Sequence, residues 1–177
     1  STVMQINTLN MFRDTSAWYH IVVGIDSTLA TASDRVKVYI NGVQQTSYND
    51  ETQPSQNQNM SINEGNPTYV TVGRKYGASN YFDGSMSHLH WIDGTQYAAS
   101  DFGETDSTTG QWKIKTSPSV TYGTNGFFIL KDGNSVTDQS GQSNNLTVAG
   151  GTLTKTEDCP SNVFSTMNPL DNYYTVH

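Results

Sequence analysis

Two stretches early in the chain carry the apolar and polar pattern of paired β-strands. Residues 18–25 are rich in aromatic and β-branched side chains, and residues 35–40 alternate polar and apolar positions with a period of two. Asn41 and Gly42 follow directly, and both tolerate the positive φ angles that a type I′ turn requires. The pattern predicts an antiparallel hairpin in which residues 43–46 return along residues 35–40.

Similar strand patterns recur along the chain. The end of one strand and four further strands are expected at residues 3–6, 69–74, 81–92, 126–130 and 145–148. Leu89 and Trp91 share one face of their strand, which we place inward, and Trp18 is assigned to the core with them. No stretch shows helical periodicity beyond about two turns. We therefore predict an all-β fold, an antiparallel sandwich.

Three polar segments are expected to be loops. Residues 32–34 form a short one, residues 49–66 are rich in Gln and Asn and are interrupted by Pro54, and residues 95–126 are irregular, with glycines between aromatic residues. The tail after residue 160 has the composition of a connector.

Charge and composition exclude some functions. The net charge is −7, and the nine Lys and Arg residues are scattered, whereas a nucleic-acid surface needs clustered cations. No segment approaches the ~18 apolar residues of a membrane span. Cys159 is the one cysteine, so no internal disulfide forms. The chain begins at Ser1 without a signal-peptide pattern, and we expect it to be part of a longer polypeptide.

The order of these segments resembles a known domain. Residues 18–23, 36–42, 70–73 and 82–89 look like the back half of the laminin-G-like, concanavalin A-like jelly roll. The resemblance implies that the front strands of the sandwich lie outside this chain.

A second set of motifs is more specific. Residues 91–94, 99–104, 109–113, 122–127 and 167–170 are similar to a family of virion proteins of tailed phages, many of them marine. The resemblance implies a non-enzymatic component of the virion exterior, such as a tail fibre, spike or head appendage. Its expected partners are other virion proteins, copies of itself in a homo-oligomer such as a trimer, and a host-surface glycan.

The domain division leaves two alternatives. Residues 1–126 are expected to form the sandwich. Residues 127–132 and 138–151 resemble the opening strands of a laminin-G-like domain, placed here after closing ones. Residues 127–177 are therefore either closing strands, exchanged with a neighbour, or the start of a following domain with a connector.

Concanavalin A-like folds also include glycoside hydrolases, so the resemblance leaves catalysis as a possible function. These resemble one another in a Glu-x-Asp-x-x-Glu strand that points two carboxylates into one cleft. Glu104 and Asp106 begin such a pattern, but Thr109 stands at the position of the second glutamate. Asp93 and Asp101 lie at expected turns, where Asp binds backbone amides. No catalytic residue is predicted.

Metal binding has two candidate sites. His88 and His90 lie two apart and could chelate an ion, although partly exposed positions on the outer face explain them better. Cys159 has no expected base beside it. Calcium is the other candidate, because several jelly-roll relatives hold it in rim loops. Its candidate ligands, which Asx turns would explain equally well, are Asp132, Asp138, Asn144 and Asn145.

Glycan binding needs exposed aromatic rings beside polar groups. Trp112, Tyr97 and Tyr122 could form such a platform, or they could pin a long loop against the sandwich. Three function hypotheses follow: a phage virion protein, an extracellular lectin-like module that binds carbohydrate, and a glycosidase, which the missing carboxylate disfavours.

Overall fold

The computed structural model describes residues 3–60, 70–75, 79–131, 135–156 and 159–160. Its elements are β1 (Gln5–Thr8), β2 (Ile21–Ile25), α1 (Ala32–Arg35), β3 (Val36–Ile40), β4 (Val43–Gln44), β5 (Tyr48–Thr52), β6 (Arg74–Lys75), β7 (Ser79–Tyr81), β8 (Leu89–Trp91), α2 (Ala99–Phe102), β9 (Gly103–Thr105), β10 (Trp112–Ile114) and β11 (Phe127–Ile129). Every strand pair in the described residues is antiparallel. Both helices are single turns, as the lack of helical periodicity predicts.

The predicted hairpin is confirmed. Strands β2, β3 and β4 form one sheet, with Ile21 opposite Ile40 and Ile40 opposite Val43. Asn41 and Gly42 have φ angles of 48° and 81°, as a type I′ turn requires. The local residues alone are sufficient to specify this turn.

Two segments expected to be loops contain regular structure instead. Residues 32–34 lie in α1, a single helical turn. Tyr48–Thr52, at the start of the predicted loop 49–66, forms β5 and pairs with β1. Four of the five β5 residues are exposed, so no apolar alternation marks this strand. Farther along, Pro54 is buried and its carbonyl accepts a hydrogen bond from Arg35 Nη1 at 2.9 Å.

The expected strands at 69–74 and 81–92 are shorter in the structure. Regular pairing is confined to β6, β7 and β8, and residue 69 lies outside the described residues. His88 has a φ of 49°, which lies outside the β region and ends strand geometry before Leu89. Residues 126–130 do contain a strand, β11, which pairs with β8. Residues 145–148 contain none.

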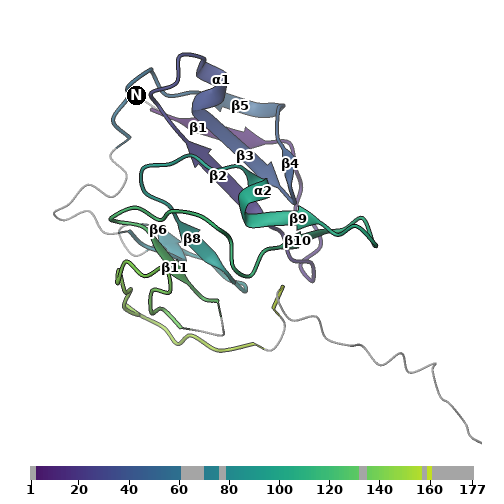
Figure 1. Cartoon of the computed structure of the whole chain (residues 1–177), viewed down its shortest axis with the longest axis vertical. Coiled ribbons are helices and arrows are strands. Elements are labelled where there is room, and N and C mark those ends of the chain that lie inside the picture. Colours follow the sequence, from purple (N-terminus) through teal and green to yellow (C-terminus); the bar gives the residue numbers. More distant parts are fainter. Residues whose placement is uncertain (1–2, 61–69, 76–78, 132–134, 157–158, 161–177) are drawn as a thin grey trace, which may run out of the picture.

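The region 95–126 is more ordered than predicted. Its chain forms α2 and then a hairpin of β9 and β10, which places Trp112 opposite Thr105. In Figure 1 this hairpin projects from the body of the molecule beside α2.

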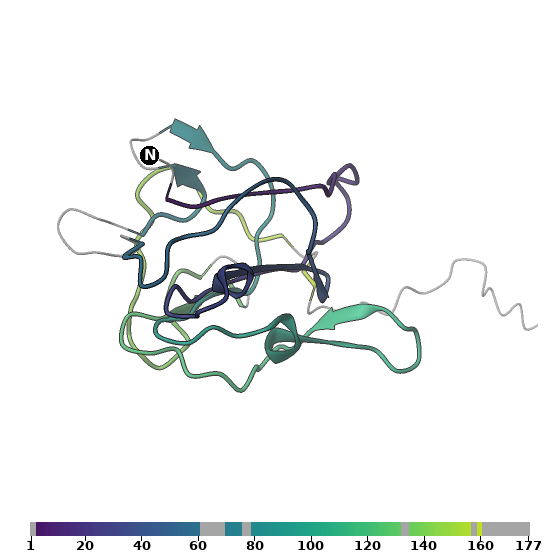
Figure 2. The same cartoon turned by 90° about the horizontal axis from the view of Figure 1, so that it is seen from above.

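The core joins the β2–β3–β4 sheet to the segment that follows β8. Figure 2 shows the layer of β2 and β3 between the purple N-terminal segment and the teal segment that carries α2 and β10. The buried apolar side chains come from β3, α2, β11 and one loop: Val36, Val38, Ile40, Ala99, Phe102, Tyr122, Phe127, Phe128 and Ile129. These layers also form the walls of a large cleft.

Candidate binding cleft

A cleft of about 1720 Å³ runs along β2. Most of its lining comes from residues 17–28, 82–97 and 111–115, and single residues such as Phe12 and Asn41 add to it. Small-molecule pockets usually measure about 300–1,000 Å³. This cleft is therefore large enough for an extended ligand or a segment of another protein.

Aromatic side chains line much of the cleft. Trp18 and Trp91 were predicted to lie in the core, but both are only half-buried and border the cleft. Phe12 and Phe82 are exposed there, and Tyr19 packs edge-on against Phe12 with ring centroids 4.9 Å apart. The core prediction for Trp18 and Trp91 was wrong because a pattern of apolar residues does not distinguish the wall of a cleft from the core.

Polar groups accompany these rings. Asp14, Asn41, Gln96 and Gln111 line the same cleft, and the amide of Gln96 also donates to the carbonyl oxygen of Asp34 at 3.3 Å. No spacing in the sequence connects these residues, because they come from four separate segments.

Trp112 is held between two glycines. A Cβ atom on Gly42 would lie 2.3 Å from the indole ring, and one on Gly103 would lie 2.4 Å from it. The indole Nε1 donates to His20 Nδ1 at 2.9 Å, and the two rings stack with centroids 5.9 Å apart. Trp112 thereby holds the β9–β10 hairpin against the β3–β4 turn. This matches the alternative in which its ring fixes a long loop against the sandwich. It also lines the cleft and is half-buried.

The other two candidate glycan residues differ in accessibility. Tyr122 is only 8% exposed, so its ring belongs to the core and not to an exposed platform. Tyr97 is half-buried and lines the cleft. Its hydroxyl accepts a hydrogen bond from the backbone N–H of Thr121 at 3.0 Å. Of the three candidates, Tyr97 and Trp112 therefore line the cleft, whereas Tyr122 does not.

His90 was predicted to lie on the outer face of its strand. In the structure its ring lies instead within a cluster of aromatic side chains. Its ring stacks on Phe128 with centroids 4.0 Å apart and also packs on Phe102 and Tyr122. Burial, together with the nearby His88 and His20, lowers the pKa of His90 to about 3. The Tyr122 hydroxyl lies 2.8 Å from His90 Nδ1. This histidine is therefore neutral at physiological pH.

The lone cysteine has polar neighbours that the sequence did not reveal. Cys159 Sγ lies 3.3 Å from Ser87 Oγ, which lies 2.7 Å from Nδ1 of His88. Serine thus separates the thiol from the imidazole. In the described part of the chain, no three His, Cys, Asp or Glu side chains are placed to hold a metal ion.

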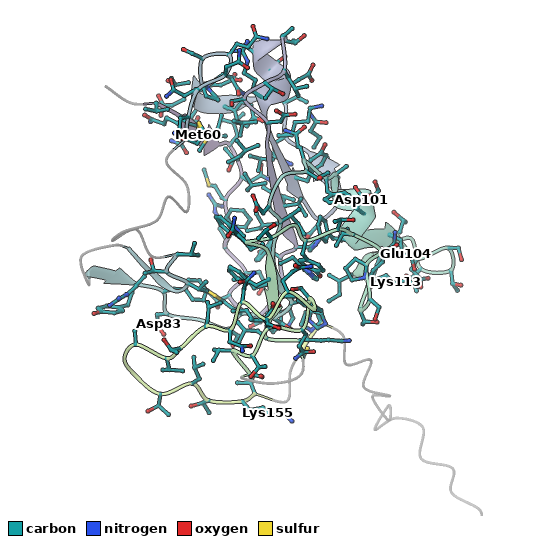
Figure 3. All side chains as sticks on the ribbon, turned by 60° about the vertical axis from the view of Figure 1, so that its left-hand side comes forward. Met60, Asp83, Asp101, Glu104, Lys113 and Lys155 are labelled. Atoms are coloured by element: carbon teal, nitrogen blue, oxygen red, sulfur yellow. The ribbon has the colours of Figure 1, made fainter. Side chains whose placement is uncertain are left out.

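The acidic residues of the motifs bind backbone amides or a lysine. Asp93 Oδ2 accepts from Asn125, and Asp101 Oδ2 accepts from the N–H of Ala98 at 2.8 Å, as predicted for aspartates at turns. Glu104 and Asp106 each lie 3.3 Å from Lys113 Nζ. Figure 3 shows Glu104 and Lys113 together on the projecting hairpin, with Asp101 on α2 near its base.

The candidate calcium ligands form a closed hydrogen-bonded loop. The Asp138 carboxylate accepts from the N–H groups of Phe128, Ser140 and Asn144 and from the Ser140 hydroxyl. Asn144 donates its amide to the carbonyls of Thr124 and Gly126. Asn145 Oδ1 accepts from the N–H of Asp138 at 2.9 Å. These contacts engage both Asp138 carboxylate oxygens and Asn145 Oδ1 in hydrogen bonds within the loop, as the Asx-turn alternative expects. Asp132 lies outside the described residues.

Comparison with known proteins identifies the family. A laminin G family model, described as the concanavalin A-like lectin/glucanases superfamily, matches residues 2–100, more than half of the 177 residues. The chain belongs to this superfamily, and the predicted antiparallel jelly-roll sandwich is confirmed. No curated protein and no solved structure matches the chain. Within the described residues, no helix has the length and apolar character to cross a bilayer.

Proposed function

We propose that this chain is a non-enzymatic assembly and attachment module on the exterior of a tailed-phage virion. Membership of the concanavalin A-like superfamily is compatible with a structural role and with a lectin-like role. The later motifs, from residues 91–94 to 167–170, favour the virion role by resemblance. In this proposal the partners are other virion proteins and further copies of the chain.

The proposal rests on one observation. Several apolar side chains that line the same cleft are exposed to solvent. Ile21 and Val23 are 55% and 53% exposed, and Phe12 and Phe82 lie exposed in the same lining. Monomeric proteins rarely leave contiguous apolar surface of this kind open, because contact with another protein removes it from water.

The acidic motif residues support a role without catalysis. Retaining and inverting glycosidases need two carboxyl groups about 5–10 Å apart across a sugar site. Glu104 and Asp106 instead share Lys113 on the exposed hairpin, and Asp93 and Asp101 hold backbone segments together. The motif carboxylates therefore make contacts that stabilise the fold. This is consistent with a module that functions by binding other proteins and not by catalysis.

Cross-linking the native assembly tests this function. The proposal expects the chain to be linked to other virion proteins in a fixed stoichiometry, with linked peptides concentrated around the cleft. Recovery of the chain without any such neighbour would contradict it.

A second candidate function, glycan binding, is favoured by the mixture of rings and polar groups in the cleft. Trp18 and Tyr97 are half-buried there, beside Asn41 and Gln96. Aromatic faces with a few hydrogen-bonding groups suit sugars. Binding of the purified chain to immobilised glycans would support this role if Trp18→Ala abolished it. Tyr81→Ala is the matched control, because Tyr81 is 67% exposed and lies outside the cleft lining.

A further inference from the structure

One hydrogen bond joins the β9–β10 hairpin, residues 103–114, to the sheet of β2, β3 and β4. Trp112 on β10 donates its indole N–H to Nδ1 of His20, the residue before β2, over 2.9 Å. Among the described residues, no other hydrogen bond or ion pair connects this hairpin to that sheet. The protonation state of His20 therefore determines whether the hairpin is bonded to the sheet.

The backbone of His20 is fixed on the sheet side of this bond. Its N–H donates to Asn41 Oδ1 at 2.8 Å, and its carbonyl oxygen accepts from the N–H of Asn41 at 2.8 Å. Asn41 directly follows β3, whose inward side chains belong to the core. The hairpin, in contrast, projects from the body of the molecule (Figure 1). When the bond between the two rings breaks, the hairpin is thus the part that moves.

The bond to Trp112 exists only while His20 is neutral. An indole nitrogen is a donor only, so Nδ1 of His20 is the acceptor and Nε2 carries the proton of the neutral ring. A protonated imidazole donates at both nitrogens, which sets two N–H groups against each other. The indole N–H lies in the ring plane, so the cation would also lie at the positively polarised edge of Trp112 and not over its negative face. Protonation therefore replaces the attraction by repulsion.

The groups around His20 do not supply a negative charge that would stabilise the cation. His90 on β8 is close enough for the two imidazole charges to interact, but it is neutral above about pH 3. Lys113 on β10 is bonded to the carboxylates of Glu104 and Asp106. Strand β2 and the β3–β4 turn contain no ionisable side chain. Within the described residues, no carboxylate forms an ion pair with His20, and burial lowers its pKa.

We propose that protonation of His20 at Nδ1 breaks its bond to Trp112 and releases the β9–β10 hairpin from the sheet, which opens one wall of the cleft. Residues 111–115, which include β10, line the cleft together with His20. The inference rests on the proposed function in one respect, because it gives the binding cleft of that function a wall that responds to pH.

The released state gains population as the pH falls. His20 has its ordinary pKa of 6.5 when it is released, whereas burial lowers this pKa in the bonded state. Below pH 6.5 the released state therefore binds the proton more readily. The ratio of bonded to released chain should fall by up to about tenfold for each pH unit below that value.

The test is an NMR titration of the purified full chain from pH 7 to pH 5 that follows the indole N–H signals of its three tryptophans. Trp112→Phe assigns the signal of Trp112. His20→Gln is the decisive variant, because the carbonyl oxygen of Gln accepts the same hydrogen bond but takes up no proton. His88→Gln is the matched control, since it removes another histidine of the cleft lining and leaves the bond between His20 and Trp112 in place.

In the wild type and in His88→Gln, the Trp112 signal should move toward that of a solvent-exposed indole with a midpoint below pH 6.5. The signal of Trp91 on β8 should stay in place, and in His20→Gln the Trp112 signal should stay as well. An unchanged Trp112 signal in the wild type, or equal movement in His20→Gln, would overturn the proposal. Movement of the Trp91 signal together with that of Trp112 would show global unfolding and would also overturn it.

This readout needs no partner, so it is independent of the virion role. A chain that fails the titration but is cross-linked to virion proteins around the cleft would lack the release and keep the proposed function. A chain that passes the titration but has no such neighbours would keep the release and lack the proposed function.

Discussion

The hydroxyl of Tyr122 lies 2.8 Å from Nδ1 of His90, inside a cluster of stacked aromatic rings. The two groups share one hydrogen bond, and the tautomer of the neutral imidazole sets which of them is the donor. Burial raises the pKa of Tyr122 to about 12 and lowers that of His90 to about 3, which keeps both groups neutral over a wide range of pH.

Stability is therefore expected to fall on acidification well before the carboxylates titrate. His90 takes up a proton near pH 6.5 when unfolded but only near pH 3 when folded, so the unfolded state binds more protons in between. The free energy of unfolding should fall by up to about 1.4 kcal/mol per pH unit below 6.5 for this group. Urea denaturation from pH 7 to pH 4 measures the slope.

His90→Gln is the control for that slope. It removes the titrating group, and the remaining slope should be smaller. His20, whose pKa burial also lowers, contributes to it, and toward pH 4 so do Asp106 and Asp138, whose pKa values hydrogen bonds lower. Equal slopes for the variant and the wild type would show that His90 does not control the acid response.

Gly103→Ala should destabilise the chain by about 1–3 kcal/mol, the usual cost of forcing atoms into a packed site. The new Cβ would lie 2.4 Å from the Trp112 ring and 2.9 Å from the Lys113 carbonyl oxygen. Gly150→Ala is the matched control: it has open space around it and should change stability by less than about 0.5 kcal/mol. Thermal or urea unfolding distinguishes the two, and a neutral Gly103→Ala would refute the packing of Trp112.

Asp138→Ala should cost about 1–3 kcal/mol, because the N–H groups of Phe128, Ser140 and Asn144 lose their shared acceptor. Asp50→Ala, which breaks an exposed bond to Asn7, should change stability far less. Calcium and a chelator should leave the unfolding temperature unchanged. An increase with calcium that depends on Asp138 would contradict the hydrogen-bonded account of this loop.

The sequence predicts the parts of the fold whose signal is local. Asn41 and Gly42 specify their turn by backbone preference alone, and Val36, Val38 and Ile40 mark one buried face by alternation. Strand β5 could not be predicted, because its mostly exposed polar residues pair with β1 through backbone groups. In such a case the pairing partner, and not the local pattern of apolar and polar residues, determines that a strand forms.

The candidate site was predictable only in part. Trp112 and Tyr97 were named as candidates and do line the cleft, whereas the ring of Tyr122 is buried. His90 packs against Tyr122 and also borders the cleft. Alternation placed Leu89 and Trp91 inward and His90 outward. The pairing of β8 with β11, whose three residues are all buried, covers His90 as well. That contact spans more than thirty residues of sequence, and no local pattern contains it.

The most direct test of the assembly role is the mass of the native particle that contains this chain, with its neighbours identified by cross-linking. The account predicts several copies in a fixed, symmetric complex with other virion proteins. A free monomer that instead binds immobilised glycans through the cleft would contradict the assembly role and establish the lectin-like one.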